Sequence, residues 1–194
     1  MEIVRAFVAI ELPEPIKAIL SQLQNELKKN KIAPVKWVAP EGIHLTLKFL
    51  GNVDAGEIPK LSEALSEAVK GVVSFNLELG NPGAFPNIHS PRVVWVGLAG
   101  ELEWLRALNN NIERVLIPLG FSAEQRAFSP HLTLGRVRED ASSDERRRLG
   151  ERVGLLKIEG KSSFRVDSLS LMRSTLTREG AIYSRLASFE LAGH

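Results

Sequence analysis

The tetrapeptide His-Leu-Thr-Leu occurs twice, at residues 44–47 and 131–134, and contains the side chains of this sequence best suited to chemistry. The two copies account for two of the four histidines. In an extended strand, alternate side chains point to opposite faces, so the His and Thr of each copy share one face and the two leucines share the other. We therefore expect the leucines to face a core and the His–Thr pairs to face a polar region. The repetition indicates an internal duplication of one site.

Two imidazoles and two hydroxyls that share one cleft are suited to phosphodiester hydrolysis. Imidazole titrates near neutral pH, so a neutral ring can take a proton from water while a protonated ring donates one to the leaving oxygen. The hydroxyls of Thr46 and Thr133 can donate hydrogen bonds to the non-bridging phosphate oxygens. If a pseudo-two-fold axis relates the copies, His44 and His131 lie on opposite sides of the cleft. The residues alone do not decide which ring is the acid.

Other chemistries have less support in the sequence. There is no His-x-His or HExxH pattern, and no carboxylate lies within the tetrapeptides to complete a zinc site. The chain has no cysteine, which removes thiolate ligands and a cysteine nucleophile. A Walker-type phosphate loop and a serine nucleophile elbow are also absent. We therefore expect catalysis without a metal and without a cofactor.

The elements that must position these residues are alternating strands and helices. Apolar residues at helical spacing predict helices at 15–29, 58–69, 102–116 and 143–153. Strand patterns occur at 3–10, 35–38, 43–50, 74–79, 92–98, 131–137, 164–173 and 181–191. Segment 80–91 is rich in Gly and Pro and is predicted to be an irregular loop. The strands lack the long apolar runs of buried parallel sheets, which favours an α+β fold with antiparallel sheets.

Composition limits the class of protein further. Of the 194 residues, 44% are hydrophobic and 25% are charged, values typical of a globular chain. A formal net charge of +2 does not indicate a broad groove for duplex DNA. No apolar stretch of ~18 residues is present, so we expect a cytoplasmic protein without a membrane partner. Nothing in the sequence demands more than a monomer.

The two motifs, with their flanking residues, resemble the signatures of the two-histidine phosphoesterases. These are HLTLKFLG at 44–51 and SPHLTLGR at 129–136. Within that superfamily the chain is similar to the RNA 2′,3′-cyclic phosphodiesterases, also called 2′-5′ RNA ligases. The similarity extends to the opening RAFVAIELP, to GAFP before PRVVWVGL, and to the closing L-x-R-S-x-L-T-R-E-G-A-I-Y.

This resemblance implies a fold, a substrate and a role for each histidine. The fold would be a single domain over residues 1–194 with two pseudo-two-fold-related lobes, each an antiparallel sheet backed by helices, and an active site in the cleft between them. The substrate would be an RNA end bearing a 2′,3′-cyclic phosphate, opened to a 2′-phosphomonoester. His44 would be the proton donor and His131 the proton acceptor. Three alternatives remain: 2′-5′ ligation of tRNA halves, hydrolysis of another cyclic or 2′-5′-linked nucleotide, and non-catalytic binding of RNA ends.

Further residues are weaker candidates for substrate binding. By alternation, Lys48 shares the face of the preceding His–Thr pair and is either a phosphate ligand or a rim residue. Arg136 is out of phase with its motif and would reach the substrate only through a bulge near Gly135. Trp37 and Phe85 are candidates for stacking a base, with packing as the alternative. The other residues considered are assigned to packing (Phe7, Phe49, Trp95 and Phe128) or to the surface (His89 and His194).

Overall fold

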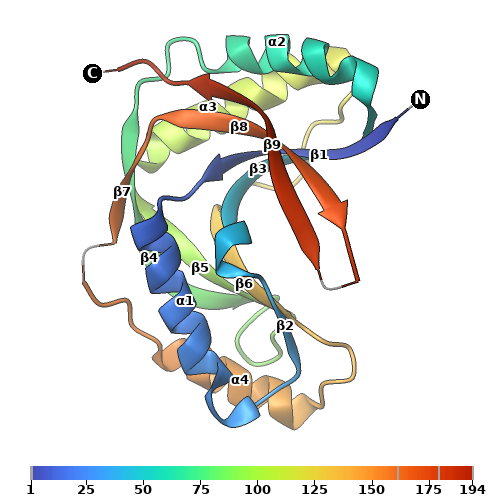
Figure 1. Ribbon diagram of the computed structural model, residues 1–194. Coiled ribbons are helices and arrows are strands. Elements are labelled where there is room, and N and C mark those ends of the chain that lie inside the picture. Colours follow the sequence, from blue (N-terminus) through green and yellow to red (C-terminus); the bar gives the residue numbers. More distant parts are fainter. Residues whose placement is uncertain (1, 161, 179, 194) are drawn as a thin grey trace.

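The computed structural model of the chain describes residues 2–160, 162–178 and 180–193, and its strands form two antiparallel sheets (Figure 1). The four-stranded sheet has the order β3-β1-β8-β9, with β3 (His44–Asp54), β1 (Ile3–Glu11), β8 (Ser168–Leu176) and β9 (Ala181–Glu190). The five-stranded sheet has the order β2-β6-β5-β4-β7, with β2 (Val35–Trp37), β6 (His131–Val137), β5 (Val93–Gly100), β4 (Phe75–Phe85) and β7 (Ser163–Val166). The expected α+β class with antiparallel sheets is confirmed.

Each sheet is backed by its own pair of helices. α2 (Ile58–Ala68) and α3 (Leu102–Leu116) lie against the four-stranded sheet, and α1 (Glu14–Lys28) and α4 (Ser143–Leu155) lie against the five-stranded sheet (Figure 1). The helices form where the sequence places apolar residues three or four apart, as in α1, whose buried positions include Ile16, Leu20, Leu23 and Leu27. The two sheet-and-helix layers are the two lobes.

The two tetrapeptides begin one strand in each lobe. His44 is the first residue of β3 and His131 is the first residue of β6, and these two strands contact each other. The predicted alternation holds through the tetrapeptides, since all four leucines are buried while both histidines and both threonines are only half-buried. The leucines belong to one continuous apolar cluster, so the same core supports both motifs from behind.

The lobes do not correspond to the two halves of the sequence. β2, from the first half, pairs with β6, while β8 and β9, from the second half, extend the sheet that contains β1. The chain passes from one lobe to the other at Asp167, which separates β7 from β8. The prediction of one strand over 164–173 is therefore wrong, because this segment belongs to two different sheets.

The loop predicted for 80–91 is also partly wrong. β4 continues through residues 80–85 and pairs with β5 up to Phe85 opposite Val93. A register shift between Leu79 and Pro82 accommodates the Gly and Pro residues. Proline has no backbone N–H to donate, and at a bulge the ladder does not need that hydrogen bond. Among the described residues, no helix is long and apolar enough to cross a membrane.

Candidate active site

The two histidine rings are held by the same local contact. Nδ1 of His44 lies 2.7 Å from the Gly42 carbonyl oxygen, and Nδ1 of His131 lies 2.7 Å from the Ser129 carbonyl oxygen. A carbonyl oxygen only accepts hydrogen bonds, so Nδ1 of each ring must carry the proton. Nε2 is therefore the nitrogen that can exchange a proton with a substrate. Each contact is local in sequence, because the partner lies two residues earlier in the chain.

Aromatic rings enclose His44. Its ring centroid lies 4.7 Å from that of Phe7 and 4.9 Å from that of Tyr183, which meets it edge-on. Burial lowers the pKa of His44 below the ordinary 6.5, although the Gly42 carbonyl and the negative charge of Glu11 act in the opposite direction. His44 therefore gives up its proton more readily than an exposed histidine.

His131 has a comparable pair of aromatic neighbours. The Phe85 ring meets it edge-on at 5.0 Å, and the Trp95 ring lies 6.5 Å away. Trp95 in turn lies directly over Gly83, where a Cβ atom would be only 2.4 Å from the indole ring. Glycine is thus required at position 83 for the indole to occupy this place. The indole Nε1 is buried and has no hydrogen-bond partner among the described residues.

A carboxylate network lies beside His44. Glu11 is the cross-strand neighbour of His44 and accepts hydrogen bonds from Ser170 Oγ and Arg185 Nε, both at 2.7 Å. Burial would raise the pKa of Glu11, but the hydrogen bonds from Arg185 and Ser170 outweigh it and hold this pKa below its ordinary value. A negative charge is therefore fixed near the first histidine.

Both motif strands contain a β-bulge at the fourth residue of the tetrapeptide. In β3, Thr46 pairs with Ala9 and Lys48 with Val8, so Leu47 is an inserted residue. In β6, Thr133 pairs with Trp95 and Gly135 with Val94, so Leu134 is inserted in the same way (partners in β5). An inserted residue reverses the alternation that follows it. We call the side of each sheet that carries the His–Thr pair the motif face.

The first bulge corrects the placement expected for Lys48. Its side chain is only 8% exposed and points away from the motif face, toward α3. Both carboxylate oxygens of Glu113 lie 2.9 Å from Nζ, and Nζ also donates to the Ser122 carbonyl at 2.7 Å. The alternation rule failed here because the sequence does not reveal the inserted Leu47. Lys48 thus ties β3 to the segment that leads into β6.

The bulges bring different side chains to the motif faces. Phe49 pairs with Phe7, their ring centroids are 6.3 Å apart, and Phe49 is 69% exposed, so the expectation that it packs inside is wrong. Arg136 pairs with Val93, which shares a face of β5 with Trp95, and it is exposed. The bulge required to place Arg136 on the motif face is thus present.

The remaining candidates divide between the site and the scaffold. Trp37 packs against the core, with Lys28 Nζ 5.8 Å from its ring centroid, and Phe128 also packs against the core. Phe85 instead contacts His131. Tyr183 was not singled out from the sequence, because only the pairing of β8 with β9 places it beside His44. Of the two other histidines, His89 is exposed and His194 lies outside the described residues.

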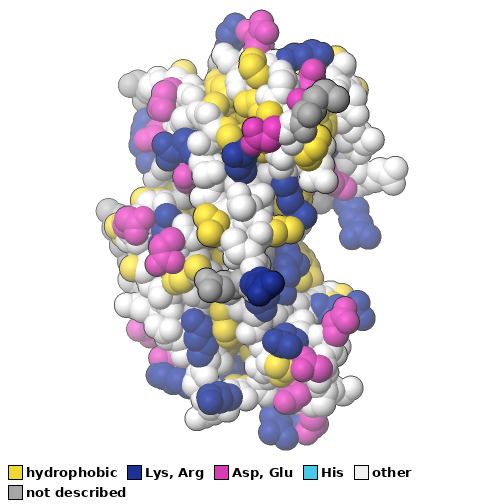
Figure 2. Space-filling view, turned by 45° about the vertical axis from the view of Figure 1, so that its right-hand side comes forward, with side chains coloured by type: hydrophobic (Ala, Val, Ile, Leu, Met, Phe, Trp, Pro, Cys, Tyr) yellow, Lys and Arg dark blue, Asp and Glu magenta, His cyan; other side chains and the backbone are white. Residues whose placement is uncertain are grey.

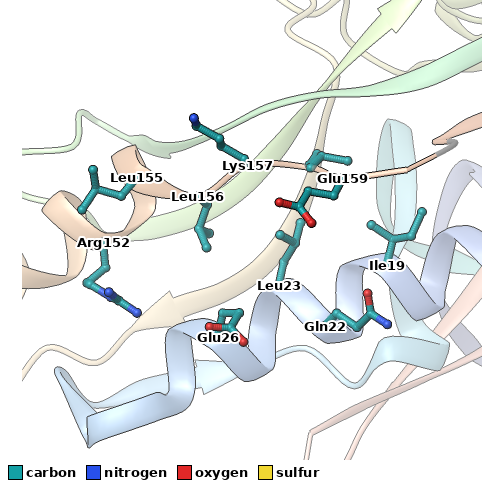
Figure 3. A pocket seen from close by; sticks show the side chains of 10 residues that line it. Ile19, Gln22, Leu23, Glu26, Arg152, Leu155, Leu156, Lys157 and Glu159 are labelled. Atoms are coloured by element: carbon teal, nitrogen blue, oxygen red, sulfur yellow. The ribbon is translucent and has the colours of Figure 1, made fainter.

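Other surface features lie away from the motif residues. A cavity of about 530 Å³ lies between α1 and the end of α4, with Ile19, Leu23, Leu156 and Ile158 among its apolar lining residues (Figure 3). On the face shown in Figure 2, basic and acidic side chains are interspersed over the described residues, in keeping with the net charge of +2. The described residues contain no group of three or more His, Asp or Glu side chains that could hold a metal ion.

Comparison with known proteins gives consistent matches along nearly the whole chain. A family model described as LigT-like phosphoesterase matches residues 10–95 and, separately, residues 96–183, so that each match contains one tetrapeptide. The RNA 2′,3′-cyclic phosphodiesterase of Methanothermobacter thermautotrophicus is 36% identical over 188 residues, which are 97% of this chain and 99% of that protein. The protein of the same name from Thermotoga maritima is 35% identical, with 97% of this chain and 96% of that protein covered.

Solved structures agree with the sequence relatives. The crystal structure of E. coli LigT complexed with 3′-AMP superposes with a TM-score of 0.78 at 27% identity, covering 98% of this chain and 99% of that one. A crystal structure of a Thermus thermophilus protein gives the same TM-score at 26% identity, with the same coverage. The expected two-lobed fold is confirmed by these neighbours.

Proposed function

The chain belongs to the LigT-like phosphoesterase family, and from this premise we propose that it hydrolyses RNA 2′,3′-cyclic phosphate ends to 2′-phosphomonoesters by histidine acid–base catalysis without a metal. The observation that carries this proposal is the duplicated histidine. Each copy lies on its own lobe, is held at Nδ1 by a carbonyl and keeps Nε2 for proton exchange. Contact between β3 and β6 supports the view that both rings act on one phosphate.

The reaction needs one proton acceptor and one proton donor. His131 Nε2 takes a proton from water as the water oxygen forms a bond to phosphorus. The bond from phosphorus to the 3′ oxygen breaks, and His44 Nε2 gives this oxygen its proton, which leaves a 3′-hydroxyl and a 2′-phosphate. Thr46 and Thr133 donate hydrogen bonds to the non-bridging oxygens, where negative charge increases in the transition state.

The surroundings of His44 support its role as the proton donor. Because burial lowers the pKa of His44, its protonated form is a stronger acid than an exposed imidazolium. The negative charge of a bound phosphate raises the pKa of His44, so this ring is protonated in the complex with the substrate. Arg136 on the motif face adds a cation that can bind the phosphate, while Phe49 offers an exposed ring to the base of the terminal nucleotide.

The test is hydrolysis of a nucleoside 2′,3′-cyclic phosphate, with the position of the product phosphate identified. The proposal expects the 2′-monophosphate, formed equally well in EDTA. His44→Ala and His131→Ala should each lower kcat by ~10²–10⁴-fold, since each removes one proton-transfer role. His89→Ala, which changes an exposed histidine in a turn, is the matched control and should leave kcat unchanged.

Each alternative predicts a different result in the same assay. Binding of the cyclic phosphate without turnover would favour a non-catalytic binding module. Loss of turnover in EDTA would show that a metal takes part. Joining of tRNA halves in place of hydrolysis would favour the 2′-5′ ligase activity. Near-normal turnover by either motif variant would refute the two-histidine mechanism.

A further inference from the structure

The fourth residue of each tetrapeptide receives a hydrogen bond from a buried side-chain amide. Asn109 of α3 is 7% exposed, and its Nδ2 donates to the Leu47 carbonyl at 3.0 Å. Gln24 of α1 is fully buried, and its Nε2 donates to the Leu134 carbonyl at 2.9 Å and to the Val38 carbonyl at 2.7 Å. The partners are all carbonyl oxygens, so the nitrogen of each amide must face them. The same contact thus occurs once in each lobe.

These carbonyls belong to the two inserted residues. An inserted residue lies outside the regular ladder, and a buried carbonyl near such an irregularity needs a donor from elsewhere in the fold. Asn109 supplies that donor to the Leu47 carbonyl. Gln24 adds a second donor to the Leu134 carbonyl, which also accepts a hydrogen bond from the Val38 backbone N–H at 2.9 Å. The two amides come from different helices, at unrelated positions in the sequence and with side chains of different length. An aliphatic residue would fill the same space without the hydrogen bond. Packing alone therefore does not account for two buried amides aimed at equivalent atoms.

We propose that Asn109 and Gln24 are positioning residues that hold the two β-bulges and so determine which side chains reach the phosphate. This inference rests on the proposed hydrolysis. In a strand without the bulge, alternation would return Lys48 to the motif face and turn Phe49 toward α3. The same change in β6 would remove Arg136 from its motif face. The carbonyls that accept these hydrogen bonds belong to the residues directly after Thr46 and Thr133, so the amides fix each strand next to the hydroxyl that contacts the substrate in the proposed reaction.

The experiment compares the near-isosteric variants Asn109→Leu and Gln24→Met with the full-length parent. The matched controls are Asn110→Leu and Gln22→Met, because these residues are exposed on the same two helices. Turnover of a nucleoside 2′,3′-cyclic phosphate is measured at a temperature where near-UV circular dichroism shows every variant to be folded. Misplacement of a catalytic strand by about 1 Å costs on the order of 100-fold in rate, so we expect each buried variant to lose ~10–100-fold in kcat. The controls should stay within about twofold.

Amide hydrogen exchange on the same variants separates a local role from a general loss of stability. Asn109→Leu should accelerate exchange at residues 45–49 and Gln24→Met at residues 132–136, while amides elsewhere keep the parental rates. Folded variants with parental kcat would overturn the inference, as would exchange that rises equally along the whole chain. If the parent itself has no turnover, the proposed function fails, and the exchange pattern alone decides whether the amides hold the bulges.

Discussion

Replacement of Lys48 by methionine tests whether this residue supports the fold or binds phosphate. Methionine keeps the aliphatic length but removes the charge that bonds to Glu113 and to the Ser122 carbonyl. Among the described residues, the Glu113 carboxylate would then retain one hydrogen bond, from the Glu124 backbone N–H at 3.3 Å. The substitution therefore leaves a poorly solvated negative charge and an unpaired carbonyl beside β3.

The size of the effect follows from the burial of the pair. Breaking a fully buried ion pair costs roughly 3–5 kcal/mol of unfolding free energy, because the remaining charge is uncompensated. The Lys48 side chain is 8% exposed and the Glu113 side chain 18%, so water recovers part of this loss. We expect a loss of ~2–4 kcal/mol. In a chain of this length each kcal/mol lowers Tm by about 2–4 °C, which makes a fall on the order of 10 °C the expected result.

Urea denaturation and steady-state kinetics together give the measurement. Lys48→Met should lose stability, while KM for a cyclic phosphate stays within about twofold of the parent, because Nζ lies on the helix side of β3. Lys60→Met is the control, since the exposed pair of Lys60 with Glu57 contributes under ~1 kcal/mol. The double change Lys48→Met/Glu113→Leu should regain most of the lost stability. Unchanged stability with a tenfold higher KM would refute the structural role and restore the phosphate-binding interpretation.

Two more predictions concern the surroundings of the histidines. The NMR titration of His44 should give a pKa below 6.5, and the rate that depends on its protonated form should fall as the pH rises through this pKa. Inorganic phosphate should raise the pKa of His44. Glu11→Gln should lower it, because the negative charge that favours the protonated ring is lost. A pKa above 6.5 in the free protein would contradict the burial argument. Gly83→Ala should destabilise the fold by ~1–3 kcal/mol in urea denaturation and reduce kcat, since the new Cβ would displace Trp95 from its place beside His131. Parental stability and kcat would show that the indole can move without consequence.

The elements of the fold were largely predictable, because burial follows local periodicity. The helix predicted at 15–29 forms at Glu14–Lys28, and the motif strands begin within one residue of the expected positions. The assignment of strands to sheets was not predictable in the same way. The chain changes sheets at Asp167, within what looks like one continuous strand, and partners distant in the sequence decide that change.

The site was predictable only as far as alternation holds. The four residues of the His–Thr pairs come from a repeat that is visible in the sequence, and each pair shares a half-buried face opposite the leucines, as alternation predicts. Aromatic rings flank both histidines on that face, so it is less polar than expected. One residue beyond each tetrapeptide the rule fails, because a bulge reverses the faces. The amides that hold these bulges come from Asn109 and Gln24, and no local pattern marks them.

The two motif strands, β3 and β6, have a bulge at the same position but different neighbouring elements. β3 is the edge of its sheet, which leaves space for Lys48 to reach α3. In β6 the equivalent position is Gly135, and β2 covers it so closely that a Cβ would lie 2.7 Å from Val35 and 2.9 Å from Trp37. A side chain at this position is compatible with the first lobe and not with the second.

This asymmetry bears on the different steps that we propose for the two histidines. The next position places the exposed ring of Phe49 on the first motif face and the guanidinium of Arg136 on the second. His44 packs between Phe7 and Tyr183, and burial lowers its pKa below the ordinary 6.5, so its protonated form is a stronger acid than that of an exposed histidine. The second motif face carries the Arg136 cation, which in the proposed reaction binds the phosphate that is attacked by the water activated by His131. The burial of His44 and the Arg136 cation on the second motif face together support the proposed donor at His44 and acceptor at His131.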